Sequence, residues 1–227
     1  MTNLLTAPLL PEIVRYHVNR ETHKLVALNQ VYWVVVGLVV NGGVLLCYPM
    51  LPWLYGHWTA HNVGLDNRLL SLLLAGLVLY NVGALMASHL NGINSLRIVL
   101  AVSVVRATLC LGGGALGYGS MGLAGLGMGI LAGEFFAVLM TVRYFMVHEL
   151  TRNGREMPTA TLASVALSAG SAVLFLLSVG MGWVPGGWGW FLSLAGVAVG
   201  STWGWITLDQ EVRRRLLALA TQRYRSN

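Results

Sequence analysis

Six long apolar runs constrain this chain more than any other feature of its sequence. A helix needs about 20 apolar residues to cross the hydrocarbon core of a membrane, and each run is about that long. The runs do not alternate in polarity, as membrane strands do. The sequence therefore predicts an all-α fold, a polytopic membrane bundle of six transmembrane helices. The predicted spans are Val31–Leu54, Leu69–Leu90, Leu96–Leu116, Met121–Met146, Thr161–Trp183 and Trp188–Leu208.

The composition agrees with a membrane location. Charged residues make up only 10% of the 227 residues, whereas about 25% is usual in a soluble domain. So few charges cannot cover a water-facing surface, which excludes an ordinary cytosolic enzyme and a nucleic-acid-binding chain. Membrane lipids are the first partners that we expect.

The basic residues predict the orientation of the bundle. If the chain crosses six times, almost all of them lie on one side, and only Arg68 lies on the other. Because basic residues collect on the cytoplasmic side, we expect both termini in the cytoplasm. The expected outer loops are Trp58–Arg68, Gly117–Ser120 and Val184–Gly187.

Two amphipathic segments flank the membrane domain of residues 31–208. Residues 1–30 mix charges with apolar side chains, notably from Pro11 to Gln30, which is typical of a helix at the membrane surface. Residues 209–227 form a basic tail in which Val212, Leu216 and Leu219 follow helical spacing. We expect this tail to bind lipid headgroups, with docking of another protein as the alternative.

Two charges interrupt the apolar runs near mid-membrane. Arg106 lies in the third span and Glu134 in the fourth, at similar distances from the turn that joins these spans. A charge at the bilayer centre costs about 2.5–3.5 kcal/mol, so each needs a partner or a wet cavity. One interpretation is a closed structural ion pair. The other places the pair in a polar cavity where Arg106 attracts an anionic substrate.

Asn41 and Asn81 are further candidates for substrate contact, although interhelical hydrogen bonds explain them better. His89 falls at a helix end, and we expect it at the interface. His57 and His61 are four residues apart with Asp66 nearby. We expect no metal there, because the adjacent prolines and Gly56 argue against a regular helix.

No other feature predicts a cofactor, a metal site or enzymatic chemistry. The two cysteines, Cys47 and Cys110, lie in apolar runs and are expected to be buried thiols. The glycine-rich stretch around Ser120 matches neither a nucleotide-binding loop nor a serine-hydrolase elbow. An intramembrane enzyme is therefore the least favoured class of function.

Glycines recur every four residues on the third and fourth spans. Small residues at this spacing allow two helix backbones to approach closely. We expect tight packing of these spans, and the alternative is that the glycines let them bend or slide. The residues expected to pack are Gly113, Gly117, Gly125, Gly129 and Gly133.

The order of short motifs from Pro11 to Val147 resembles the C-terminal part of the lipid-linked oligosaccharide flippases, in the multidrug/oligosaccharidyl-lipid/polysaccharide exporter superfamily. The motifs are Pro11-Glu12-Ile13, Leu54-Tyr55-Gly56, His89-Leu90-Asn91-Gly92 followed by Arg97, and the glycine-rich segment Gly117–Gly125.

The resemblance implies a flippase, or the C-terminal half of one, in a bacterial inner membrane. Its substrate would be an undecaprenyl-pyrophosphate-linked glycan for polysaccharide biosynthesis. A partner chain would supply the N-terminal bundle that such flippases have and this chain lacks. The alternative is a non-transporting scaffold subunit of a larger membrane complex.

Overall fold

In the computed structural model, residues 9–151, 156–183, 188–208, 210 and 213–214 are described, and every regular element among them is a helix. The segments labelled η2, η4 and η5 are π-helical, and η3 is a short 3₁₀-helix. The elements are α2 (Leu10–Val18), α3 (Thr22–Val35), η2 (Val36–Asn41), α4 (Gly42–Cys47), η3 (Tyr48–Met50), α5 (Leu51–Trp58), α6 (Asn67–Gly92), α7 (Leu96–Thr108), η4 (Leu109–Gly113), α8 (Gly114–Met121), α9 (Leu123–Tyr144), η5 (Phe145–Leu150), α10 (Thr159–Gly180) and α11 (Trp188–Ile206).

Five continuous helical segments among the described residues are long and apolar enough to cross a membrane. They are Thr22–Trp58, Asn67–Gly92, Leu96–Met121, Leu123–Leu150 and Thr159–Gly180. These segments make the chain a multi-pass membrane protein. Five of the six predicted spans correspond to them.

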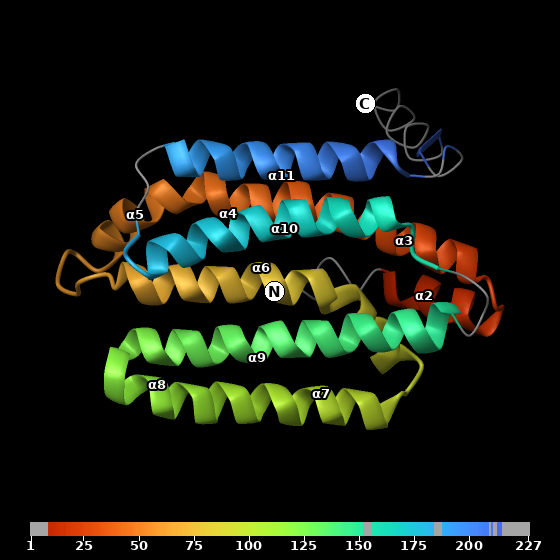
Figure 1. Cartoon of the computed structure of the whole chain (residues 1–227), viewed down its shortest axis with the longest axis horizontal. Helices are drawn as coiled ribbons and strands as arrows, with labels where there is room; N and C mark the ends of the chain where they lie inside the picture. Colours follow the sequence, from red (N-terminus) through yellow and green to blue (C-terminus); the bar gives the residue numbers. More distant parts are fainter. Residues whose placement is uncertain (1–8, 152–155, 184–187, 209, 211–212, 215–227) are drawn as a thin grey trace.

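The sixth predicted span corresponds to α11, which is not among the five. This helix has 19 residues, and four of them are tryptophans. Tryptophan and glycine contribute little to mean hydropathy, and α11 is rich in both. Figure 1 shows α11 beside α10 and α4, in line with the other long helices. The sixth crossing, and the orientation that depends on it, stay predictions.

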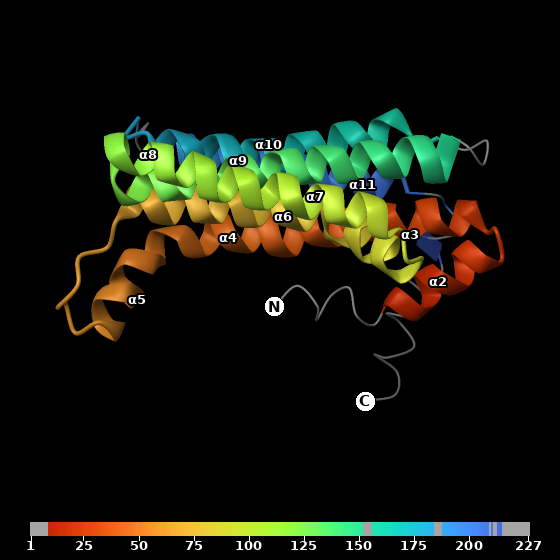
Figure 2. The same ribbon diagram turned by 90° about the horizontal axis from the view of Figure 1, so that it is seen from below.

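The long helices lie side by side with their axes along one direction (Figure 1). In this view α11 and the α7–α8 rod are at opposite edges, and α6 lies between α10 and α9. Seen from below, α5 bends away from the bundle at one end, and α2 lies against it at the other (Figure 2).

Helix α6 is the most buried of the five candidate spans and links two clusters of buried apolar side chains. Near α2, Ile13, Phe145 and Leu150 pack together against the last turns of α6. Toward the other end, Leu72 and Leu176 belong to a second cluster that α4, α9, α10 and α11 complete. The bundle is therefore packed along its length around α6.

Hydrogen bonds between helices accompany this packing. Trp33 Nε1 donates to the carbonyl of Val82 at 2.8 Å, and Trp190 Nε1 donates to that of Leu45 at 2.7 Å. In the buried interior Gln30 Nε2 donates to Thr161 Oγ1 at 2.9 Å. Such bonds satisfy polar groups that would otherwise lie unpaired in an apolar medium.

The first candidate span is longer than predicted at both ends. Helical structure begins at Thr22 and continues through Pro49, Pro52 and Gly56 to Trp58. The span therefore continues past its predicted end at Leu54. Each proline lies in the first turn of a new helical element, where proline is tolerated because that N–H needs no intrahelical partner.

The amphipathic segment predicted from Pro11 to Gln30 is two helices rather than one. Arg20 has φ of 56° and separates α2 from α3. Beyond this break Lys24 Nζ lies 2.8 Å from Glu21 Oε2. The bond that Lys24 donates holds the pKa of the Glu21 carboxyl below its usual value. The short helix α2 can thus fold back over the end of α6.

The turn between the third and fourth spans lies later than predicted. The Gly117–Ser120 segment is part of α8, and the chain reverses at Gly122, where φ is 59°. This left-handed conformation favours glycine because a side chain would clash with the backbone. The outer loop Val184–Gly187 lies outside the described residues, as does nearly all of the tail 209–227.

Candidate functional site

The two mid-membrane charges meet across neighbouring helices. A terminal guanidinium nitrogen of Arg106 on α7 lies 2.9 Å from Glu134 Oε2 on α9. This confirms the predicted ion pair. The Glu134 side chain is 15% exposed, but that of Arg106 is 35% exposed, so the cation is the more open partner.

Helix α6 also lies against this ion pair. The Arg106 Cζ lies 5.3 Å from the centre of the Tyr80 ring, within the range of a cation–π contact. A Cβ atom on Gly76 would lie 3.8 Å from Glu134 Cγ. Glu134 therefore lies against α6 one turn before Tyr80, and the pair is held at the junction of three helices.

Glycine determines how closely α7 and α9 approach at the pair. A Cβ on Gly133 would lie 2.6 Å from Cys110 Sγ and 3.0 Å from the Arg106 carbonyl oxygen. The first distance is shorter than real Cβ contacts and the second is tighter than most of them, so glycine next to Glu134 lets the Arg106 backbone lie against α9.

The other predicted packing glycines continue this contact toward the turn. A Cβ on Gly125 would lie 2.1 Å from the carbonyl carbon of Gly117, and one on Gly129 would lie 2.3 Å from the Gly114 nitrogen. A Cβ on Gly113 would lie 3.3 Å from Gly129 Cα. The glycine face thus packs inside the α7–α9 hairpin.

Asn41 and Asn81 are both buried but differ in their hydrogen bonds. Asn41 Nδ2 donates to Ser168 Oγ on α10 at 3.2 Å, as expected for an interhelical bond. Asn81 Nδ2 instead donates to the Leu77 carbonyl in its own helix, and its backbone carbonyl accepts from Tyr32 OH at 3.2 Å. A substrate contact of either residue stays a prediction.

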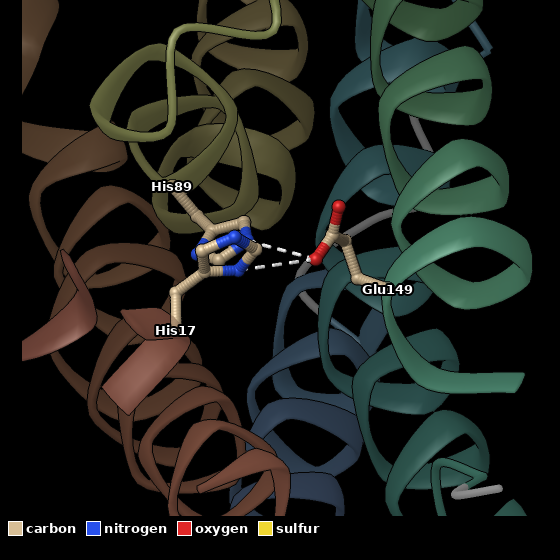
Figure 3. A group of neighbouring side chains, drawn as sticks. All are labelled: His17, His89 and Glu149. Atoms are coloured by element: carbon tan, nitrogen blue, oxygen red, sulfur yellow. Dashed lines mark ion pairs between the residues drawn. The ribbon is translucent and has the colours of Figure 1, made fainter. Parts of the chain in front are cut away.

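A second polar cluster lies near the α2 end of the bundle (Figure 3). His17 comes from α2, His89 from α6 and Glu149 from η5. Glu149 Oε2 lies 3.4 Å from His17 Nδ1 and 3.5 Å from His89 Nε2. The three residues are far apart in the sequence and meet only in the fold.

His89 is the most enclosed member of this cluster. Only 1% of its side chain is exposed, although it lies near the end of the candidate span Asn67–Gly92. The rings of His17 and Phe145 pack edge-on against it, each with its centroid 5.3 Å away. Burial follows from the folding back of α2, which hydropathy alone does not predict.

His57, His61 and Asp66 lie around the connection between α5 and α6. The His57 and His61 rings have centroids 6.1 Å apart. Asp66 faces its own helix, where Oδ1 accepts from the backbone nitrogens of Arg68 and Leu69 at 2.9 and 3.1 Å. It is the N-cap of α6, which accounts for its carboxylate without a metal. Helix α5 carries His57 but ends at Trp58, and Ala60 and His61 have positive φ, so no regular helix spans the two histidines, as predicted.

The cysteines differ from the expectation that both are buried. Cys47 is exposed and Cys110 is half-buried. An exposed thiol on an apolar span acts as a small apolar side chain.

Comparison of the chain with protein-family models, with curated proteins and with solved structures finds no match. Both clusters are therefore interpreted from their own geometry.

Proposed function

We propose that this membrane protein moves a lipid-linked oligosaccharide across the bacterial inner membrane, as the C-terminal half of a flippase. The Arg106–Glu134 pair supports this proposal most. Arg106 lies near the middle of the candidate span Leu96–Met121, so its partly exposed guanidinium offers a positive charge inside the membrane.

The chemistry of the substrate matches such a charge. An undecaprenyl-pyrophosphate head carries negative charge that is costly to move through hydrocarbon, and a guanidinium binds phosphate oxygens with paired donors. Glu134 would hold Arg106 between substrate molecules, and the pyrophosphate would displace it. The undecaprenyl chain would remain in lipid.

The geometry also supports a second candidate, a scaffold subunit. Within the described chain α7 has no buried residue, and a Cβ on Gly112 or Gly119 would meet nothing within 4 Å. Small residues on an open helix face allow another helix to approach. Under this proposal the ion pair serves only to join α7 to α9.

Export by the double variant Arg106→Leu/Glu134→Leu separates the two candidates. Replacing both members of a buried pair is often nearly neutral for stability, so the variant should fold. The flippase proposal predicts loss of glycan export, measured as lipid-linked glycan on the outer leaflet of cells that also express the partner chain. The scaffold proposal predicts export at the wild-type level.

The variant Arg68→Leu is the matched control. It also removes one arginine from a candidate span, but Arg68 lies at the start of α6 rather than at mid-membrane. It should export normally. If Arg68→Leu and the double variant lose export equally, loss of an arginine from any position in a span explains the effect and the substrate role of Arg106 is excluded.

A further inference from the structure

We infer that His17, His89 and Glu149 form a binding site for a divalent transition metal, with zinc as the best fit. The ligand atoms of the three side chains all lie within 4.8 Å of one another. Two imidazoles and one carboxylate are a frequent ligand set for zinc. The inference is independent of the proposed function, since it concerns the other polar cluster.

Two of the three spacings between ligand atoms match a tetrahedral ion. With bonds of about 2.0–2.2 Å, two ligand atoms of a tetrahedral zinc lie about 3.3–3.6 Å apart. The His17–Glu149 and His89–Glu149 distances are 3.4 and 3.5 Å. Direct hydrogen bonds between nitrogen and oxygen are usually 2.7–3.2 Å long. Both contacts therefore fit ligand spacing better than hydrogen bonding.

The buried histidine gives an independent reason. Neither ring nitrogen of His89 has a hydrogen-bond partner among the described residues, although the side chain is almost fully buried. Leaving a buried polar group unsatisfied has a cost in stability. A metal ion bound through Nε2, the nitrogen nearer to Glu149, would remove part of that cost.

A cavity leads to the site. It has a volume of about 410 Å³, and both His17 and Glu149 line it. An ion can therefore reach the ligands, and water can occupy a fourth position, as in zinc sites with three protein ligands. His148 also lines the cavity, but its ring stacks on Tyr144 with centroids 4.4 Å apart.

The local backbone also fits a binding site. Glu149 lies in the π-helical segment η5, and π-helical turns inside α-helices often occur at functional sites. A metal here would join α2 to the ends of α6 and η5. We therefore expect the ion to hold α2 against the bundle.

Zinc titration of the full chain tests the inference. The protein is purified in detergent without a polyhistidine tag, treated with EDTA, dialysed and titrated with ZnCl₂ in a calorimeter. The wild type should bind one zinc per chain, and X-ray absorption should show two imidazoles and oxygen as ligands. Zinc should also raise its thermal midpoint, because a ligand that binds only the folded state stabilises it.

His17→Gln and Glu149→Gln should each weaken zinc binding more than about 100-fold, since even residues behind metal ligands contribute 10–100-fold. His17 is partly exposed, so His17→Gln should fold even if changes at His89 do not. His23→Gln is the control, because His23 is an exposed histidine at the start of α3. It should bind zinc like the wild type.

Two results would overturn the inference. One is a wild-type chain that binds no stoichiometric zinc. The other is zinc binding that survives both His17→Gln and Glu149→Gln, because the ion would then be held elsewhere.

Discussion

The two polar clusters of this bundle differ in how the chain assembles them. Arg106 and Glu134 lie on two helices joined by one tight turn, and glycines bring those helices together. His17, His89 and Glu149 come from three separate parts of the chain. The first cluster depends on local packing, whereas the second depends on the docking of α2. Variants that act on one and not on the other test this difference.

The largest expected effect is on the ion pair. Breaking one side of a fully buried pair costs about 3–5 kcal/mol, and this pair is half-buried, so a loss of up to about that size is expected. Arg106→Leu and Glu134→Leu should each lower the free energy of unfolding, because each leaves the other charge unpaired near mid-membrane. The free energy of unfolding in detergent, measured by titration with a denaturing detergent, gives both values.

The double variant Arg106→Leu/Glu134→Leu should recover most of that loss. Single variants as stable as the wild type would contradict a tightly held ion pair. The two clusters would then not differ in how much they contribute to stability.

Gly125→Ala should have the next largest effect. Its Cβ would meet the Gly117 carbonyl carbon at 2.1 Å, and backbone cannot move aside as a flexible side chain can. Overpacking typically costs about 1–3 kcal/mol. Loss of thermal stability in detergent would measure the cost, and the Arg106–Glu134 contact should weaken with it.

Gly119→Ala is the matched control in the same hairpin. A Cβ there would meet nothing within 4 Å, so the change should be neutral or stabilise by up to about 1 kcal/mol. If both variants lost the same thermal stability, close helix contact would not explain the effect of Gly125→Ala.

Asn41→Ala should have a moderate effect. Its bond to Ser168 joins two helices, and such a bond contributes about 0.5–1.5 kcal/mol. A double-mutant cycle with Ser168→Ala should give a measurable coupling energy for Asn41. The same cycle between Asn81→Ala and Ser168→Ala should give none, because Asn81 donates within its own helix.

The smallest effect is expected for His17→Ala in metal-free buffer. Its contact with Glu149 is long and partly exposed, and exposed ion pairs contribute about 0–1 kcal/mol. The loss of unfolding free energy should therefore stay below about 1 kcal/mol without zinc and grow when zinc is added. A large loss in EDTA would show that the cluster is held together without a metal.

The sequence predicts the ion pair because both charges interrupt apolar runs. Arg106 and Glu134 are charged residues within apolar spans. Counting residues from the turn that joins the two spans places both charges at a similar depth in the membrane. The glycine spacing is informative for the same reason, since helical periodicity and one short turn determine which faces meet.

The histidine cluster could not be predicted in this way. His17, His89 and Glu149 lie near helix ends, where polar side chains are ordinary. Their meeting depends on the break at Arg20 and on packing of α2 against α6, which are tertiary features. The one local signal is His89 in an otherwise apolar stretch. Because a polar residue is common at a helix end, this signal does not by itself indicate a cluster.

The position of Glu149 in the histidine cluster depends on the number of residues in the π-helical segment η5. A π turn has i→i+5 hydrogen bonds and holds more residues than an α turn, and removing one residue ahead of Glu149 without reforming that turn would shift Glu149 by one helical position. Each residue of an α-helix turns the chain by about 100°, and Glu149 would rotate by about that angle. A one-codon deletion just before Glu149 would therefore keep both histidines and the carboxylate in the protein while separating them in space.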